Sequence, residues 1–295
     1  MAKLLHQHTQ SDSHSLLLDS QGIEDLTNDI GNLNDLRVLS AWDNNLTSLP
    51  ESLWELRGLH TLNLAGNKLT SIPEGIGDLS NLRMLDLGHN QLGQLPDSLG
   101  NLHQLRYLYL SDNQLSSLPP SMNNLSHLEY LNITDNQLVQ LPDWLGELSN
   151  LIELRLYNNA ISSLPESLCN LNNLREFDAM NNALESLSIE LGKLSQLRIL
   201  DLQGNRLTEL PGSIVELAEL TELNLRFNKL SFLPKDIGNL GNLRFLDLRA
   251  NQIESLPESI QELQNLKKLD LRWNGLSESP SWLKALEKQG CIIHI

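Results

Sequence analysis

Leucine and polar residues follow one pattern along the chain, and the pattern repeats with a constant period. The frame is LxxLxLxxNxL, as in LRMLDLGHNQL from Leu82 to Leu92. It occurs eleven times, every interval is 23 residues, and the first leucine never varies. Its asparagine is found at Asn44, Asn67, Asn90, Asn113, Asn136, Asn159, Asn182, Asn205, Asn228, Asn251 and Asn274. Self-similarity at a period of this length is typical of a stacked repeat solenoid.

Each repeat predicts a short strand, a turn and a return segment. The LxxLxL part alternates apolar and polar residues as a half-buried strand does, and the following LxxLPxxLGxL has a looser, helix-like spacing. One repeat alone cannot bury its leucines, but stacked repeats form a continuous core and a parallel sheet at about 4.8 Å per strand. We therefore expect an α/β repeat solenoid with a concave parallel β-sheet, roughly 50 Å long, and an irregular or 3-10-helical convex side.

Asparagine and proline have structural explanations in this frame. A buried asparagine needs its amide satisfied, and hydrogen bonds to backbone groups of the turn, repeated from unit to unit as a ladder, achieve this. Proline follows in ten units, where its fixed φ and missing N–H suit the return segment, and Ser188 replaces it in the eleventh. Phe177 and Ala179 occur in that same unit. A large residue beside a small one predicts local repacking of the core there.

These in-register units resemble the leucine-rich-repeat family, specifically the 23-residue class of Ras-suppressor-like proteins, plant intracellular Ras-group proteins and many bacterial proteins. The resemblance covers about Leu16 to Leu286. It implies a horseshoe-shaped solenoid and a role in protein interaction. Because one fold can host many functions, the resemblance is more specific for the fold than for the function.

The ends of the chain predict capping segments, because terminal repeats would otherwise expose core leucines and a sheet edge. We expect a flexible tail at 1–14, a capping repeat at 15–35, the array of eleven units at 36–280 and a C-terminal cap at 281–295. The last segment reads as a short helix followed by a closing strand, with Cys291 in its core. The tail contains His6, His8 and His14, which could hold a metal ion, but a polar tail is the simpler interpretation.

Charge and cysteine content narrow the class of protein. The chain has 21 basic and 37 acidic residues, a net charge of -16, so it would repel nucleic acid and anionic lipid. Its only cysteines are Cys169 and Cys291, too few for the disulfide-capped repeats of oxidising compartments. No signal peptide or apolar segment long enough to span a bilayer is visible. We expect a cytoplasmic protein that binds neither nucleic acid nor membrane.

Function is expected in the variable residues that point out of the strands. Numbered from the first leucine of a repeat, these are the third, fifth, seventh and eighth positions. They hold eight of the thirteen aromatic residues, which favours a binding surface, although strands favour aromatic residues in any case. We expect the four tyrosines to be near neighbours and the two methionines to flank them. The candidates are Trp42, Met84, Tyr107, Tyr109, Tyr130, Tyr157, Met180, Phe227, Phe245 and Trp273.

A column of arginines is the second candidate. Arg226, Arg249 and Arg272 occupy the seventh position of three successive repeats, and Asp201, Asp247 and Asp270 occur at the fifth position. Like charges stacked about 4.8 Å apart repel unless they are offset. The column is therefore either a self-neutralising ladder or a docking strip for an acidic partner segment, framed by Phe227 and Trp273.

No residue pattern predicts catalysis, a cofactor or a metal site. Cys169 has no histidine at matching height in adjacent units, and His60, His89, His103 and His127 lie in different columns. The leading hypothesis is a monomeric protein-interaction module, an adaptor or recognition scaffold that binds a protein partner on its concave face. The alternative is the recognition subunit of a bacterial effector or signalling enzyme whose catalytic part is another chain. A third hypothesis, an idealised structural array, fits the unbroken period but not the irregular unit with Ser188.

Overall fold

The computed structural model describes residues 14–277 and 280–295. His6 and His8 of the expected tail lie outside the described residues. The chain divides into two compact units, one ending at Leu138 and the other beginning at Val139. Each unit is a stack of repeats with parallel strands on one side and 3-10 turns on the other. The prediction of an α/β repeat solenoid is confirmed.

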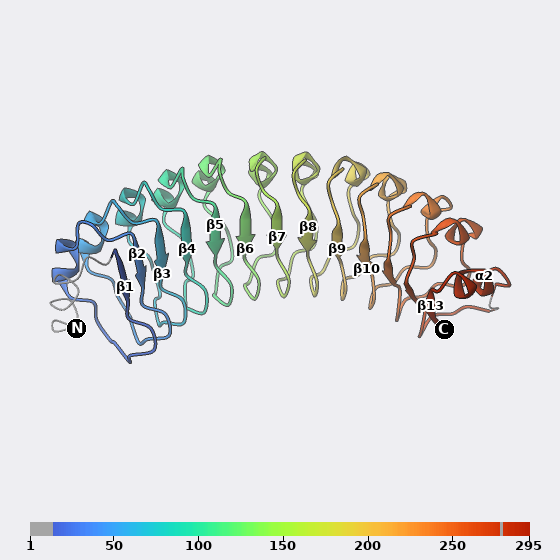
Figure 1. Cartoon of the computed structure of the whole chain (residues 1–295), viewed down its shortest axis with the longest axis horizontal. Helices are drawn as coiled ribbons and strands as arrows, with labels where there is room; N and C mark the ends of the chain where they lie inside the picture. The colour runs from blue at the N-terminus through green and yellow to red at the C-terminus, as the bar shows by residue number, and fades with distance from the viewer. Residues whose placement is uncertain (1–13, 278–279) are drawn as a thin grey trace. The chain divides into compact units, whose positions relative to one another are not determined.

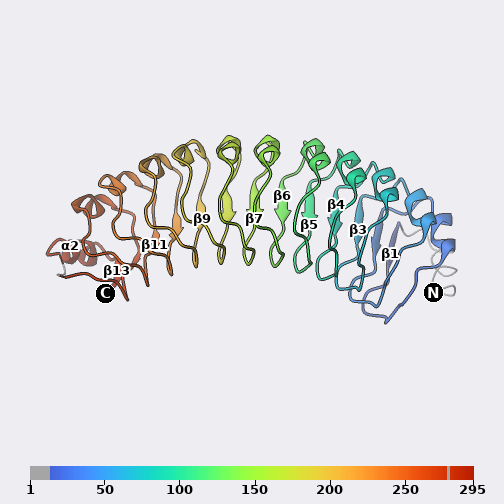
Figure 2. The same ribbon diagram turned by 180° about the vertical axis from the view of Figure 1, so that it is seen from behind.

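Between residues 14 and 138, the first unit contains six parallel strands and five 3-10 helices. Neighbouring strands pair with a register of 23 residues, so that Met84 lies opposite Tyr107 and Tyr107 opposite Tyr130. Figures 1 and 2 show these strands side by side, with the helical turns along one edge. The strands are β1 (Ser15–Leu17), β2 (Val38–Ser40), β3 (Thr61–Asn63), β4 (Met84–Asp86), β5 (Tyr107–Tyr109) and β6 (Tyr130–Asn132). The helices are η1 (Asn28–Asn32), η2 (Glu51–Glu55), η3 (Glu74–Asp78), η4 (Asp97–Asn101) and η5 (Pro120–Asn124).

The second unit continues the same pattern and ends with an α-helix and a last strand. Cys291 lies between them and is buried. The strands are β7 (Glu153–Arg155), β8 (Glu176–Asp178), β9 (Ile199–Asp201), β10 (Glu222–Asn224), β11 (Phe245–Asp247), β12 (Lys268–Asp270) and β13 (Ile292–His294). The helices are η6 (Asp143–Glu147), η7 (Glu166–Asn170), η8 (Leu191–Lys193), η9 (Gly212–Glu216), η10 (Ile237–Asn239), η11 (Glu258–Glu262) and α2 (Leu283–Lys288).

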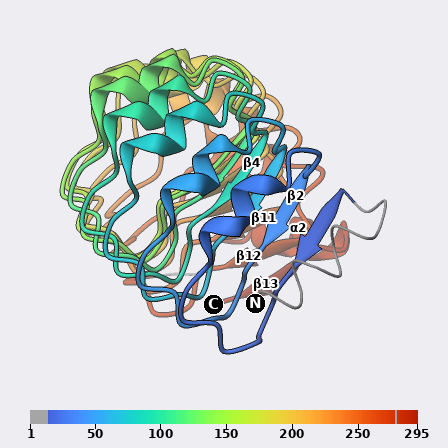
Figure 3. The same cartoon turned by 90° about the vertical axis from the view of Figure 1, so that its left-hand side faces the viewer.

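Proline explains where most return segments begin to turn. In the first unit the helices η2 to η5 each follow a proline whose φ lies between -62° and -73°, with an extended ψ. This φ is fixed by the ring, so proline sets the direction in which the helix starts. The end-on view in Figure 3 shows these turns on the opposite side of the repeats from strands β2 and β4. The leucines of both sides fill the space between them.

The frame asparagine joins each repeat to the one before it. The side-chain nitrogen of Asn67 donates to the carbonyl oxygens of Leu64 at 2.9 Å and of Ala41, in the preceding repeat, at 2.9 Å. Its side-chain oxygen accepts the N–H of Leu46 at 3.0 Å. The same bonds recur at other frame asparagines, for example Asn113 and Asn228. The predicted ladder is confirmed.

The repeat that lacks proline is the irregular one. Phe177 and Ala179 are both buried, as expected for a large residue whose volume is offset by a small neighbour. Ser188 precedes η8, which begins only at Leu191 and has three residues instead of five. The helix η10 is equally short although Pro234 precedes it, so loss of proline is not the sole cause of shortening.

We predict that Asn113→Ala lowers the free energy of unfolding by about 2–4 kcal/mol, because it leaves several buried backbone groups unpaired. The side chain of Asn113 donates to the carbonyl oxygens of Leu87 and Leu110 and accepts the N–H of Leu92. Urea denaturation followed by circular dichroism measures the change. The matched control is Asn123→Ala, since Asn123 is exposed in η5 and its loss is expected to cost less than about 0.5 kcal/mol. Equal losses in both variants would refute the ladder as the main tie between repeats.

Candidate protein-binding surface

The third and fifth positions of each repeat point away from the core. The middle residue of every three-residue strand from β2 to β12 is buried, whereas its neighbours are mostly exposed or half-buried. The seventh and eighth positions follow at the end of the strand. We call the surface that these four positions form in each unit its sheet face.

Three tyrosines and a methionine lie together on the sheet face of the first unit. Met84, Tyr107 and Tyr130 are register partners on adjacent strands. The rings of Tyr109 and Tyr130 are 4.8 Å apart between centroids and tilted by 38°. Tyr107 is 38% exposed. We call these four residues the tyrosine patch.

The other aromatic candidates are distributed over both units. Trp42 is 46% exposed at the seventh position of a first-unit repeat. Tyr157 and Met180, which the sequence placed beside the tyrosines, belong to the second unit and are half-buried there. Phe245 begins β11 and is 44% exposed. The structure thus brings together the tyrosines of β5 and β6 and assigns Tyr157 to a separate unit.

The arginine column of the second unit pairs mainly with its own aspartates. Arg249 Nη2 lies 2.7 Å from Asp247 Oδ2, and Arg272 Nη2 lies 2.6 Å from Asp270 Oδ2. The Asp270 side chain is 0% exposed. Burial alone would raise the pKa of Asp270, but hydrogen bonds from Arg272 and the charges of Arg249 and Arg272 outweigh burial and lower it. This geometry favours the self-neutralising ladder for these two arginines.

Arg226 differs from the other two arginines. Its Nε donates to the side-chain oxygen of Gln203, and its guanidinium lies 5.5 Å from the ring centroid of Phe227. Among the described residues it forms no ion pair with a carboxylate. Its charge therefore stays available on the sheet face.

Two exposed aromatic side chains occupy strained backbone positions. The eighth residue of each repeat has a positive φ, a conformation that suits Gly, Asn and Asp. Yet Phe227 has φ 56° and Trp273 has φ 61°, with exposures of 47% and 68%. Ala250 takes this position in the repeat between them, and the two rings lie 6.3 Å apart between centroids. We call Phe227 and Trp273 the rim pair.

Acidic residues at the fifth position serve the local backbone. The side-chain oxygen of Asp86 accepts the N–H of Gly88 at 3.0 Å, and that of Asn63 accepts the N–H of Ala65 at 3.0 Å. Asp and Asn therefore make the same turn at the end of a strand. This bond was not predicted from the sequence, although Asp and Asn recur at the fifth position. Partial burial of the fifth-position carboxylates raises the pKa of Asp86 and raises the pKa of Asp178 to about 6.

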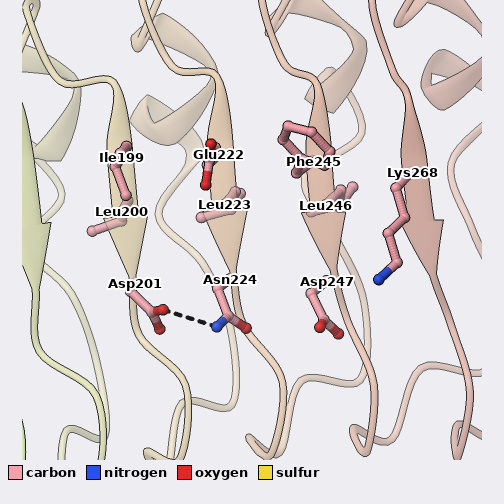
Figure 4. Close-up of a pocket in the computed structure, with 10 residues that line it drawn as sticks. All are labelled: Ile199, Leu200, Asp201, Glu222, Leu223, Asn224, Phe245, Leu246, Asp247 and Lys268. Carbon is pink, nitrogen blue, oxygen red and sulfur yellow. Dashed lines mark hydrogen bonds between the residues drawn. The ribbon is translucent and has the colours of Figure 1, made fainter.

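A shallow depression of about 260 Å³ lies on the sheet face of the second unit. Strands β9 to β12 line it with Asp201, Asn224 and Asp247 along one side and Phe245 and Lys268 along the other (Figure 4). Asn224 donates to Asp201 at 2.9 Å, and burial raises the pKa of Asp201. The depression is open to solvent, so it neither encloses a substrate nor excludes water, and it is suited to contact with a partner side chain.

Other chemically active groups are dispersed. Burial raises the pKa of the Cys169 and Cys291 thiols, which makes them poor nucleophiles. Within residues 14–277 and 280–295, no three His, Cys, Asp or Glu side chains are arranged to hold a metal ion. In the same part of the chain, no helix has the length and apolar character needed to cross a membrane.

Comparison with family models identifies the repeats. A model described as "Leucine rich repeat" matches residues 57–115, 180–230 and 219–276. One described as "Leucine-rich repeat region" matches residues 90–200, and one described as "Leucine Rich repeats (2 copies)" matches residues 34–74. The chain belongs to the leucine-rich-repeat family. Repeats of this family are typically interaction modules without enzymatic activity.

Solved leucine-rich-repeat structures are similar over most of this chain, whereas no curated protein matches it significantly. A Leptospira interrogans leucine-rich-repeat protein is 32% identical, with TM-score 0.72, over 93% of this chain and 82% of that protein. A TDR receptor is 31% identical, with TM-score 0.84, over 92% of this chain and 49% of the receptor. The plant peptide hormone receptor RGFR1, solved in complex with RGF2, is 30% identical, with TM-score 0.73, over 89% and 52%. This chain spans about half the length of the two receptors.

We predict that Asp178→Asn stabilises this leucine-rich-repeat protein at pH 7, by on the order of 2 kcal/mol. The pKa of Asp178 is raised from 3.8 to about 6 by burial, with the charge of Asp201 adding to the effect. The folded state therefore disfavours the ionised carboxylate of Asp178. The resulting loss of folding stability appears as pH rises from about 4 to 6 and is absent below both pKa values. Asparagine keeps the acceptor that Asp178 offers to the N–H of Met180. Thermal denaturation at pH 3.5 and 7 measures the effect. The control is Glu185→Gln, at an exposed position. A gain in stability that is the same at both pH values would contradict this explanation.

We predict that Arg272→Met destabilises the leucine-rich-repeat protein by about 2 kcal/mol at pH 7, because it removes the main donor to a buried carboxylate. The folded pKa of Asp270 is lowered, so its favourable contribution is present above the unfolded pKa of about 3.9 and is lost as pH falls through the folded value. The difference between wild type and variant should therefore shrink in acid. Urea denaturation at several pH values tests this, and Arg226→Met, which breaks no ion pair with a described carboxylate, is the control. An equal effect of the two substitutions would count against the ladder.

Proposed function

We propose that this leucine-rich-repeat chain is an adaptor or recognition scaffold that binds a protein partner on the sheet face, with the rim pair as a main contact. That the chain is a protein-binding scaffold follows from its family. The rim pair is the single observation that supports binding on the sheet face. Phe227 and Trp273 are large, exposed and close together, which are properties of residues that dominate protein interfaces.

Folding alone does not explain the rim pair. The eighth position lies after the strand, so the general preference of strands for aromatic residues does not apply to it. A bulky residue in the left-handed region costs on the order of 1 kcal/mol relative to Asn or Gly. Other repeats use Asn158, Asn181 or Gly204 there. The chain thus retains a locally unfavourable residue on its surface, and partner binding supplies a reason for keeping it.

The surroundings of the rim pair also suit a protein partner. The guanidinium of Arg226 lies 5.5 Å from the ring centroid of Phe227, and Arg249 and Arg272 occupy the same position of the next two repeats. Aromatic and arginine side chains together are the composition that interface centres favour. Related structures were solved with partners, including RGFR1 with RGF2 and Toll with Spatzle. These observations support binding of a protein or peptide.

A cytoplasmic location is part of the proposal. Both cysteines are free and buried, which fits a reducing compartment. The sheet face carries no enclosed pocket among the described residues, and this fits recognition rather than catalysis. The alternative, a recognition subunit of a separately encoded enzyme, uses the same surface and is distinguished by the identity of the partner.

We predict that the double variant Phe227→Asn, Trp273→Asn loses its partner while folding at least as well as wild type. Asparagine is a native occupant of this backbone position, so thermal stability should stay the same or rise by about 1 kcal/mol per site. Binding should weaken roughly tenfold or more, as for hot-spot residues. Affinity capture from source cells, followed by quantitative mass spectrometry, compares the partners of the two proteins.

The matched control is Phe232→Ser. Phe232 is 49% exposed but lies on the return segment of the same repeat as Phe227, where other repeats have Ser71 or Ser117. A partner kept by wild type and by this control but lost by the double variant would support the sheet face. Partners that are all retained by the double variant would reject it. A partner that contains a catalytic domain would assign the chain to the alternative function.

A further inference from the structure

The sheet face of the first unit carries aspartates but neither Lys nor Arg. In its four full repeats and in the part of the fifth that begins at Leu128, none of the third, fifth, seventh and eighth positions is Lys or Arg. Four of these positions are acidic, at Asp43, Asp86, Asp112 and Asp135. The opening repeat adds Asp19 at the seventh position. This differs from the second unit, where the same positions include Arg155, Arg226, Arg249, Lys268 and Arg272.

The basic residues of the first unit lie at other positions. Arg37, Arg83 and Arg106 occupy the second position of their repeats, before the strand begins. Arg106 pairs with Glu129, and Arg37 donates to the carbonyl oxygen of Gly58. They therefore do not neutralise the aspartates through ion pairs described in the structure. On the sheet face itself, His89 lies 2.8 Å from Asp112. Asp86 forms no ion pair among the described residues, so its carboxylate can receive a cation from outside.

Asp86 lies beside the tyrosine patch. It follows Met84 on β4, and its register partner on β5 is Tyr109. One carboxylate oxygen accepts the N–H of Gly88 at 3.0 Å. The residue is only half-buried, so a partner side chain can approach the carboxylate. A negative charge next to stacked aromatic rings is a site for an organic cation.

The chemistry of this surface selects lysine and arginine. Tyrosine faces attract ammonium and guanidinium groups, and a carboxylate adds a charge-assisted hydrogen bond, which is bidentate for arginine. Several such contacts along parallel strands suit an extended segment rather than a single ion. Burial also raises the pKa of Asp86, and a bound cation would relieve that cost of desolvation.

We propose that the sheet face of the first unit binds a Lys- and Arg-rich segment of the partner protein, with the segment lying over the tyrosine patch and one of its cations at Asp86. The inference rests on the proposed function, because it names the kind of partner that this surface accepts. It involves a different unit from the rim pair, so the two can fail separately.

The test measures binding of a fluorescein-labelled nine-residue oligoarginine peptide to the full chain by fluorescence anisotropy. A nine-residue oligoglutamate peptide is the comparison probe. We expect wild type to bind oligoarginine and not oligoglutamate, with an affinity that decreases as salt is added. Preference for oligoglutamate, or no binding of oligoarginine at low salt, would overturn the proposal.

Two variants of equal charge separate a specific surface from general attraction to an acidic protein. The sheet-face variant is Asp86→Asn, Asp112→Asn. Its fold should be kept, because Asn63 and Asn132 occupy the fifth position of other repeats with the same hydrogen bond, and Asn suits the positive φ of Asp112. The control variant is Glu55→Gln, Asp78→Asn, which neutralises two exposed residues at the ends of η2 and η3.

We expect the sheet-face variant to weaken oligoarginine binding roughly tenfold and the control less than about twofold. Replacing the aromatic rings by Tyr109→Asn, Tyr130→Thr should weaken it about 3- to 30-fold. Equal losses in the sheet-face and control variants would show that the peptide responds only to net charge and would overturn the proposal. So would an unchanged affinity in the tyrosine variant.

Two further measurements show whether a second copy of this chain occupies the sheet face, and whether a negative result concerns this inference alone or also the proposed function. Sedimentation measures whether the chain self-associates as its concentration rises. Self-association that Asp86→Asn abolishes would assign the surface to a second copy of this chain and overturn the proposal. The rim-pair variant Phe227→Asn, Trp273→Asn should bind oligoarginine as wild type does. If partner capture depends on the rim pair but oligoarginine does not bind, the proposed function stands and only this inference falls.

Discussion

The hydrogen bonds of the frame asparagine are the constraint on which the rest of each unit depends. Repeats contact only their neighbours, so the join between adjacent repeats must satisfy every buried backbone group there. Asn67 does this with one donor and one acceptor group that reach both its own turn and the preceding repeat. Because this bonding fixes the turn, the strand before it and the left-handed residue beside it adopt the same geometry each time, and the outward positions become free to vary.

Variation at those outward positions gives the two units different surfaces. In the first, tyrosines stand beside aspartates, and neither Lys nor Arg occupies the outward positions. In the second, arginines and aspartates largely neutralise each other, and exposed aromatic residues occupy the rim. The same backbone therefore presents an acidic aromatic surface in one unit and a paired polar surface in the other. Recognition of a partner would draw on differences in side chains rather than on differences in fold.

The framework could be predicted from the sequence because its residues repeat, and a buried Leu or Asn has few structural solutions. The strands, the asparagine ladder and the burial of Phe177 with Ala179 follow from the pattern. The conformations of the side chains on the sheet face could not be predicted in the same way. Sequence could not show whether Arg249 turns to Asp247 or to solvent, since both conformations suit the same residues. The positive φ of the eighth position, and with it the strain at Trp273, also escaped notice.

The interchange of Asp and Asn at the fifth position has an evolutionary consequence. Both residues give the backbone the same acceptor, at Asp86 as at Asn63, and their codons differ by a single base. A lineage can therefore alter the electrostatic character of this surface in small steps, while the scaffold is preserved. In such a protein partner preference can drift without passing through poorly folded intermediates, so relatives with nearly superimposable backbones can acquire unrelated binding specificities.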